Sequence, residues 1–369
     1  GVVDSGCSSA DFDGFPVGNI ALLQRGSCTF QQKTDNAVEA GAAAVLIFNE
    51  GQPGRRDVFG GSLDADAGNE VPVYALSYAV GKALAELGAD VPVTVSADFE
   101  RVSIPTQNVF AETVGDPSRT VVVGAHLDSV EAGPGINDNG SGVALVLESA
   151  IQMAEAGVAP DNQIRFAFWG GEELGLLGSI DYVFGLSEAD RADIMANLNF
   201  DMVASPNPVR MIYDGDGSAF GEPGPPGSTG IERVFSSWFE ANGLAYRETP
   251  FDGRSDYGPF IWTGIPAGGL FTGAEQSMTP SEAELYGGES GVAYDACYHK
   301  ACDTIENLDL DVMDQMASAA ADSIVNLGFF SGTMGAGEGP LGTPIETVHP
   351  ELPDWIPSAC SAHERIWRR

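Results

Sequence analysis

The chain of 369 residues is 43% hydrophobic, which is enough to bury a sizeable core in about two to three domains. Its 53 acidic residues outnumber its 17 basic residues and give a formal net charge of −36. This charge excludes non-specific binding to nucleic acid or to an anionic membrane surface, since both need a cationic face. No apolar run approaches the length of about 18 residues that a membrane span needs.

Residues 1–103 alternate short strands with short helices and contain no histidine. We expect strands at Asn19–Leu23, Ala43–Phe48, Val71–Leu76 and Val91–Ala97 and helices at Thr34–Gly41 and Ser77–Leu87. Gly88 would close the second helix. The run Val102–Thr106 then marks the boundary of a first, small α+β domain.

The pattern changes from Gln107 onward. Strands are expected at Thr120–Gly124, Gln163–Trp169 and Asn197–Val203, and helices at Ser141–Ala156, Leu174–Phe184, Gly230–Ala241 and Asp311–Leu327. This alternation predicts an α/β domain over residues 104–333, with a mixed, mostly parallel sheet flanked by helices. Residues 334–369 are Gly/Pro-rich without periodicity and are interpreted as a tail, so His349 and His363 receive no role.

Polar residues gather after the predicted strands, where α/β sheets bind their ligands. These segments are Gly124–Ser129, Asn137–Gly142, Trp169–Gly175 and Asn199–Asp201, with Tyr298-His299 as a distant fifth. Each segment alone has an ordinary explanation, such as a turn, a helix cap or a favourable helix-dipole contact. Their joint occurrence in one α/β frame indicates a metal site.

Imidazoles mixed with carboxylates form a zinc-like ligand set, because calcium and magnesium favour oxygen ligands alone. The set suits two metals if Asp138 bridges: His126 and Asp201 would bind one ion, and Glu173 and His299 the other. The neighbouring Glu172 would stay uncoordinated, as the general acid/base that takes a proton from the attacking water.

Asp128 stands two residues after His126 and could accept its imidazole N–H, fixing the tautomer. A calcium site near Asp309, Asp311 and Asp314 is a weaker alternative to their role as helix-start residues. The five cysteines include no CxxC pair, which argues against zinc ribbons and thioredoxin-like chemistry. The cysteines could form two disulfide bridges that close loops, Cys7–Cys28 and Cys297–Cys302, or they could be reduced buried thiols. Two bridges would imply an oxidising compartment and would leave Cys360 unpaired.

The segments around the candidate ligands resemble those of the secreted bacterial di-zinc aminopeptidases of the zinc exopeptidase superfamily, over about residues 107–330. The resemblance implies the ligand set above, with Glu172 as general acid/base. It also implies that Tyr298 stabilises the tetrahedral intermediate and that Arg254 contacts the substrate. A Cys297–Cys302 disulfide and a cis peptide bond between Asp138 and Asn139 are further implications.

Residues 1–103 resemble a protease-associated domain, most clearly at Gly18–Phe30, and a Cys7–Cys28 bridge fits that pattern. Relatives with this insert begin with part of the catalytic domain. Because Gly1 falls inside the insert, we expect the amino end to be truncated.

The expected function is a secreted, monomeric metallo-aminopeptidase that uses two Zn²⁺ ions to remove residues from peptides with a free amino terminus. A carboxypeptidase of the same superfamily is one alternative, but it needs a cationic cluster for a terminal carboxylate, and the chain has only three lysines. A non-catalytic, receptor-like peptide-binding module is another. The chain has no GxSxG or GxxxxGK[ST] motif that would favour a serine hydrolase or a nucleotide-binding role.

Overall fold

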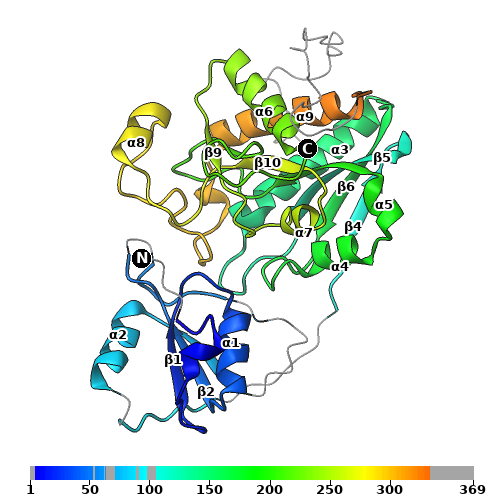
Figure 1. Cartoon of the computed structure of the whole chain (residues 1–369). Helices are drawn as coiled ribbons and strands as arrows, with labels where there is room; N and C mark the ends of the chain where they lie inside the picture. The colour runs from blue at the N-terminus through cyan, green and yellow to red at the C-terminus, as the bar shows by residue number, and fades with distance from the viewer. Residues whose placement is uncertain are drawn as a thin grey trace. The chain divides into compact units, whose positions relative to one another are not determined.

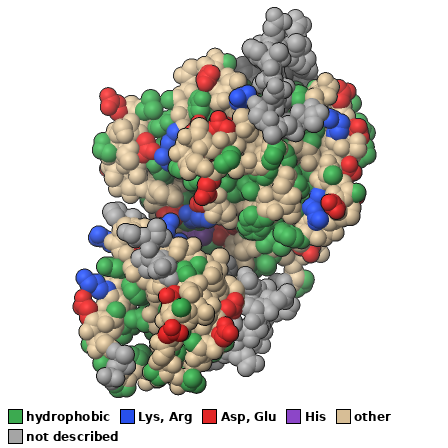
Figure 2. Space-filling model, in the orientation of Figure 1, with side chains coloured by type: hydrophobic (Ala, Val, Ile, Leu, Met, Phe, Trp, Pro, Cys, Tyr) green, Lys and Arg blue, Asp and Glu red, His purple; other side chains and the backbone are tan. Residues whose placement is uncertain are grey.

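The computed structural model describes residues 5–52, 55–61, 63, 71–88, 91–97 and 105–332. The chain divides into two compact units after Ile104 (Figure 1). The predicted tail at residues 334–369 and most of the predicted boundary run lie outside the described residues. On the face shown in Figure 2, acidic side chains are dispersed rather than gathered in one patch.

The first unit is a small parallel sheet with two α-helices. The strands β1 (Ile20–Gln24), β2 (Ala44–Phe48) and β3 (Val73–Leu76) pair in that order, and both pairs are parallel. The helices are η1 (Ser9–Phe12), α1 (Phe30–Glu39) and α2 (Tyr78–Leu87). A disulfide joins Cys7 to Cys28, so the first of the two predicted bridges is present.

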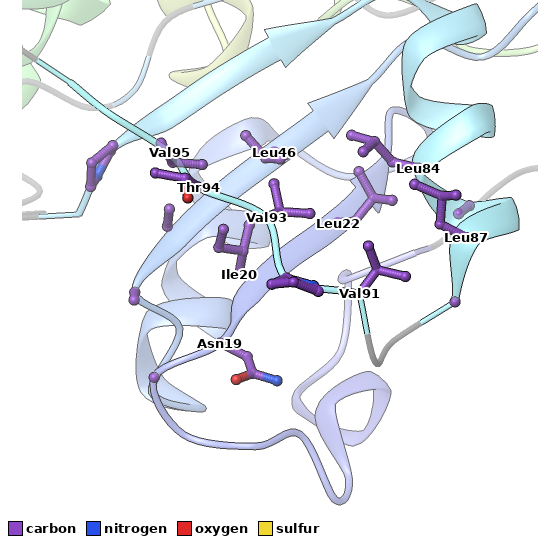
Figure 3. A pocket seen from close by; sticks show the side chains of 17 residues that line it. Asn19, Ile20, Leu22, Leu46, Leu84, Leu87, Val91, Val93, Thr94 and Val95 are labelled. Carbon is purple, nitrogen blue, oxygen red and sulfur yellow. The ribbon is translucent and has the colours of Figure 1, made fainter.

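Two expectations for this unit need correction. Helix α1 begins at Phe30 rather than Thr34, because the Thr29 side chain accepts the backbone N–H of Gln32 and caps the helix. The predicted strand Val91–Ala97 is wrong, since these residues form no strand. Val91, Val93 and Val95 line a groove of about 870 Å³ that β1 also lines (Figure 3). Alternating apolar and polar side chains indicate a segment with one apolar and one polar face, but they do not show that its backbone pairs with another strand.

The second unit is built on a seven-stranded sheet with the order β4-β6-β5-β7-β10-β8-β9. Its strands are β4 (Val109–Glu112), β5 (Asp116–His126), β6 (Asn162–Trp169), β7 (Ile194–Phe200), β8 (Met211–Tyr213), β9 (Arg247–Thr249) and β10 (Ala267–Phe271). Only β4 with β6 and β8 with β10 pair antiparallel; the other neighbours are parallel. The predicted mixed, mostly parallel sheet is confirmed.

Helices cover both faces of this sheet (Figure 1). The helical segments are η2 (Ile136–Ser141), α3 (Gly142–Glu155), α4 (Leu177–Gly185), α5 (Glu188–Ala192), α6 (Ser228–Ala241), α7 (Gly258–Trp262), α8 (Pro280–Tyr286), η3 (Ile305–Asn307) and α9 (Leu310–Gly328). Strand β5 shows how the faces separate. Val121 and Val123 pack with α3, α6 and α9, whereas Val122 packs with residues of α4 and α7.

The central strands and the long helices follow the predicted pattern, but β4, β8, β9 and β10 were not predicted, and β7 ends at Phe200 rather than at the predicted Val203. Strands β8 and β9 have three residues each, too few for a periodic signal. Strand β10 contains Gly268 and Gly269, and glycine is depleted in strands. Among the described residues, no helix has the length and apolar character of a membrane span.

Candidate metal centre

The candidate site residues meet at the carboxyl ends of adjacent strands. His126 is the last residue of β5, Glu172 and Glu173 follow β6, and Asp201 directly follows β7. These three strands are neighbours in the sheet, so their carboxyl ends place the three polar segments at one edge. Asp138 reaches the same edge from η2, which leads into α3.

His126, Asp138 and Asp201 form the first group of donor atoms, and all three are buried. The His126 Nε2 atom lies 3.2 Å from Asp138 Oδ1 and 3.3 Å from Asp201 Oδ1. Its Nδ1 atom lies 3.0 Å from the backbone oxygen of Asp128. A carbonyl oxygen can only accept, so Nδ1 carries the proton and the Nε2 lone pair faces the carboxylates.

Asp138, Glu173 and His299 form the second group. The His299 Nε2 atom lies 3.1 Å from Asp138 Oδ2 and 3.0 Å from Glu173 Oε2. The two oxygens of Asp138 therefore face different histidines, as a bridging carboxylate requires.

Glu172 stands beside both groups without belonging to either. Its Oε2 atom is 3.9 Å from His126 Nε2, beyond hydrogen-bond distance. Burial raises the pKa of Glu172 well above its ordinary value; His126 opposes this, and Asp201 and Asp256 add to it. A buried carboxyl group with a raised pKa is suited to acid/base work.

Asp128 acts differently from the expectation. Its Oδ1 atom is 3.8 Å from His126 Nδ1, and the backbone oxygen of Asp128 is the nearer partner. The carboxylate instead accepts the backbone N–H groups of Gly171 (2.9 Å), Glu172 (3.0 Å) and Glu173 (3.1 Å). Burial would raise the pKa of Asp128, but His126 and the N–H groups of Glu172 and Glu173 hold it below its ordinary value.

A network of buried hydrogen bonds fixes the backbone around Asp138. The Asp138–Asn139 peptide bond is cis, as the resemblance implied. Asp303 accepts the backbone N–H of Asn137 at 2.8 Å and of Asp138 at 3.1 Å. The Asn139 side chain donates to the backbone oxygen of Phe200, next to Asp201, at 2.9 Å. The bridging position is thereby tied to the end of β7.

His299 lies in a loop closed by the Cys297–Cys302 disulfide, the second predicted bridge. The ring of Tyr298 stacks on that of His299 with 3.8 Å between centroids. The Arg254 Nη2 atom donates to Tyr298 Oη at 3.1 Å, and Arg254 Nη1 pairs with Glu275 at 3.0 Å. Burial raises the pKa of Tyr298 well above its ordinary value, although Arg254 lowers it. The structure thus brings Arg254, Tyr298 and the second donor group together.

Sequence reasoning missed two residues beside the site, Ser255 and Asp256. Ser255 Oγ donates to Asp201 Oδ2 at 2.6 Å and accepts from Asn199 Nδ2 at 2.8 Å. Asp256 is buried and accepts the Ser179 hydroxyl at 2.5 Å, while its Oδ2 atom has no partner among the described residues. Ser255 and Asp256 adjoin Arg254 in sequence, so a search for supporting residues around that arginine could have found them.

The donor set fits metal ions. The Nε2 atom of each histidine faces two carboxylate oxygens that only accept when ionised, so a cation or a proton must stand between them. Burial would lower the pKa of His299, but Asp138 and Glu173 raise it to about 9. Glu173 Oε1 is buried without a hydrogen-bond partner among the described residues. Mixed nitrogen and oxygen donors at these positions match zinc.

The calcium site considered near Asp309 does not form. Asp309 is the N-cap of α9 and accepts the backbone N–H groups of Asp311 and Val312, both at 3.0 Å. No group of metal-binding side chains in the described part of the chain includes Asp309 or Asp311. The alternative interpretation as helix-start residues is therefore correct.

Residues 108–324 match the family model of Peptidase family M28, and residues 2–84 match that of the PA domain. The first match spans more than half of the chain. The chain belongs to peptidase family M28. The resemblance to zinc exopeptidases that carry a protease-associated domain is confirmed at the level of the family.

This M28 chain is similar to the aminopeptidase of Pseudomonas aeruginosa (strain UCBPP-PA14), with 48% identity over 319 residues. The alignment covers 86% of the chain and 59% of the relative, so the chain spans about three fifths of that protein. Among solved structures, the aminopeptidase of Aneurinibacillus sp. strain AM-1 is 26% identical with a TM-score of 0.67, covering 92% of this chain and 75% of the other. BSAP, a zinc aminopeptidase of Bacillus subtilis, is 26% identical with a TM-score of 0.58, covering 86% and 72%.

Proposed function

We propose that this M28 chain is a metallo-aminopeptidase that removes the amino-terminal residue from peptides. The observation that carries the proposal is the pair of donor groups that share Asp138, with Glu172 beside them and outside both. The relatives described as aminopeptidases, and the zinc aminopeptidase among the solved structures, support the same reaction class.

His126 and Asp201 would hold one zinc ion, Glu173 and His299 the other, and Asp138 would contact both. When bound, the two ions would supply Lewis-acid polarisation of the scissile carbonyl and a lowered pKa of the attacking water. The protein's part is to orient these donors, which the backbone oxygen of Asp128 does for the His126 ring.

Glu172 is the proton carrier of this account. Its carboxylate would take the proton from the attacking water and deliver it to the leaving amine, which needs a group whose pKa is shifted toward neutral. Burial shifts the pKa of Glu172 in that direction. Asp128 orients Glu172 by accepting its backbone N–H.

Tyr298 and Arg254 would contact the substrate. The Tyr298 hydroxyl, whose raised pKa keeps it protonated, can donate to the oxygen that becomes negative as the carbonyl is attacked. Arg254 donates to the oxygen of the same hydroxyl and holds it in place.

The charges around the site favour an aminopeptidase over a carboxypeptidase. Recognition of a terminal carboxylate needs an unneutralised cationic group, and Arg254 is paired with Glu275. The surplus of carboxylates instead suits the ammonium group of a free amino terminus.

The test is metal analysis coupled to hydrolysis of an aminoacyl anilide and of an amino-terminally blocked peptide. We expect about two zinc ions per chain, turnover of the anilide alone, and loss of turnover after chelation with recovery on adding zinc. Turnover of the blocked peptide alone would indicate a carboxypeptidase. Binding of peptides without turnover of either substrate, with zinc present, would indicate a binding module.

We further propose an extracellular location and a monomeric state. Two disulfides, one in each unit, support an oxidising compartment. The strongly negative charge favours a soluble monomer. Size-exclusion chromatography with light scattering tests the oligomeric state.

A further inference from the structure

A second group of acidic side chains lies outside the metal centre, around the loop that joins β8 to α6. Asp214 and Asp216 follow β8 directly, and Glu232 projects from the first turns of α6. One oxygen of each carboxylate lies within 4.8 Å of one oxygen of each of the other two. Burial raises the pKa of Glu248, on the neighbouring strand β9, and the charges of Asp214 and Asp216 add to the rise.

Backbone N–H groups hold two of these carboxylates in place. Glu232 Oε2 accepts from Gly215 at 2.9 Å and from Asp216 at 3.0 Å. Asp214 Oδ2 accepts from Phe220 at 2.9 Å and, at 3.2 Å, from the residue before it. Backbone N–H groups of the loop therefore fix the carboxylates of Asp214 and Glu232 without a bound ligand.

The other oxygen of Asp214 has no hydrogen-bond partner. Asp214 is 1% exposed, and its Oδ1 atom is buried with no partner among the described residues. The side chain of Asp216 is within hydrogen-bonding reach of that of Asp214. A buried acceptor without a donor costs free energy unless a ligand completes it. This oxygen is therefore a candidate ligand for a cation.

The charge of the group is not balanced by the protein. Within the described part of the chain, no lysine, arginine or histidine forms an ion pair with Asp214, Asp216, Glu232 or Glu248. Arg233, which is near enough to favour the charged form of Asp216, forms no ion pair with it. Burial raises the pKa of Glu232 to about 7, and Asp216 adds to the rise. Nearby negative charges disfavour the ionised forms of one another, and a bound cation would remove that penalty.

We propose that Asp214, Asp216 and Glu232 form a calcium site that fixes the loop between β8 and α6. The donors are oxygens alone, with no histidine or cysteine in the group, which favours calcium over zinc. Calcium also tolerates irregular ligand positions and keeps waters, whereas magnesium demands near-ideal octahedral geometry. Glu248 adds negative charge and can bind through water. The site shares no residue with the proposed zinc ligands, and the proposal does not depend on the proposed function.

The test is calcium binding to the zinc-loaded chain at neutral pH, by isothermal calorimetry with calcium chloride and by thermal unfolding. We expect one calcium ion per chain, with a Kd on the order of 10⁻⁴ M or below. At a calcium concentration about one hundred times the Kd, Tm should rise by about 5 °C or more. Calcium should also slow chymotrypsin cleavage after Phe220, which is 48% exposed in this loop.

Variants separate this site from general binding to an acidic surface. Asp214→Asn, Glu232→Gln and Asp216→Asn should each weaken calcium binding at least about tenfold. The side chain of Asp216 is exposed, so its replacement carries little risk of misfolding. Glu222→Gln removes the same charge from an exposed position in the same loop and should bind calcium like the wild type. Absence of calcium binding by the wild type, or undiminished binding by Asp216→Asn, would overturn the proposal.

Discussion

Asp128 and Glu172 are joined by a hydrogen bond of 3.0 Å from the backbone N–H of Glu172 to Asp128 Oδ1. The same carboxylate accepts the N–H groups of Gly171 and Glu173, so one side chain fixes the turn that carries Glu172 and Glu173, the proposed proton carrier and the proposed zinc ligand. The carboxylate of Asp128 therefore positions Glu172, whereas the backbone oxygen of Asp128 contacts the ring of His126.

Replacement of Asp128 should therefore affect turnover more than metal content. Asp128→Ala leaves three backbone N–H groups without their acceptor, and kcat for an aminoacyl anilide should fall about 10- to 100-fold. Zinc content should stay near two per chain. Asp128→Asn keeps one acceptor oxygen and should lose less. Steady-state kinetics with metal analysis checks this, and an Asp128→Ala enzyme with a wild-type kcat would contradict the assigned role.

Ser255 should control the affinity of one zinc ion. Its hydroxyl donates to Asp201 Oδ2 at 2.6 Å, which leaves Asp201 Oδ1 directed toward His126. Ser255→Ala should weaken the more labile zinc about 10- to 100-fold, measured by competition with a chelator. Ser149→Ala is the matched control, because that hydroxyl bonds only to the backbone of its own helix. Equal zinc affinity in the two variants would refute this role.

The two disulfides should differ in their effect on metal binding. Replacing Cys297 and Cys302 by serine frees the loop that carries His299, so we expect loss of about one zinc ion and at least tenfold lower activity. Replacing Cys7 and Cys28 alters the first unit alone and should leave the zinc content of the catalytic unit intact. Metal analysis of both variants measures this difference in zinc content. Retention of two zinc ions without the Cys297–Cys302 bridge would show that His299 is held by other contacts.

Asp256 should make the stability of the chelated protein depend on pH. Burial raises the pKa of Asp256 to about 7, although His126 and the Ser179 hydroxyl lower it. The folded state therefore binds its proton more tightly than the unfolded state. This contribution is complete below about pH 4 and is lost as pH rises through about 7, amounting to at most about 4 kcal/mol.

The matched comparison is Asp256→Asn, which keeps the shape of the side chain and cannot ionise. The variant should gain Tm relative to the wild type as pH rises from about 4 to about 7, measured by thermal unfolding in chelator. Parallel Tm curves for the two proteins across this range would show that Asp256 does not titrate on unfolding.

The sequence predicted the metal centre better than its surroundings. His126, the Glu172-Glu173 pair and Asp201 were found because they stand within or shortly after segments that the sequence predicts to be strands of the central sheet. The sequence identified Asp128 as a supporting residue, but it predicted that the carboxylate would accept the imidazole N–H of His126. Residue spacing cannot show that three backbone N–H groups donate to this carboxylate instead. Ser255 was missed because a serine gives no signal of what it bonds to.

The fold, too, could be predicted only in part. The mostly parallel sheet followed from strand and helix periodicity, whereas the three-residue strands β8 and β9 carry none. Those strands position Asp214 and Glu248, so the second acidic group was also invisible in the sequence. The calcium site had instead been considered at Asp309, where acidic residues are close along the chain but serve to begin a helix.

The most direct test of the central claim is the kcat of Glu172→Gln at full zinc occupancy. If Glu172 carries the proton and does not hold the metals, this variant should keep about two zinc ions and lose about 10²- to 10⁴-fold in kcat on an aminoacyl anilide. Glu173→Gln, with the same change one residue later, should instead bind less zinc. A Glu172→Gln enzyme with two zinc ions and a near-wild-type kcat would contradict the account.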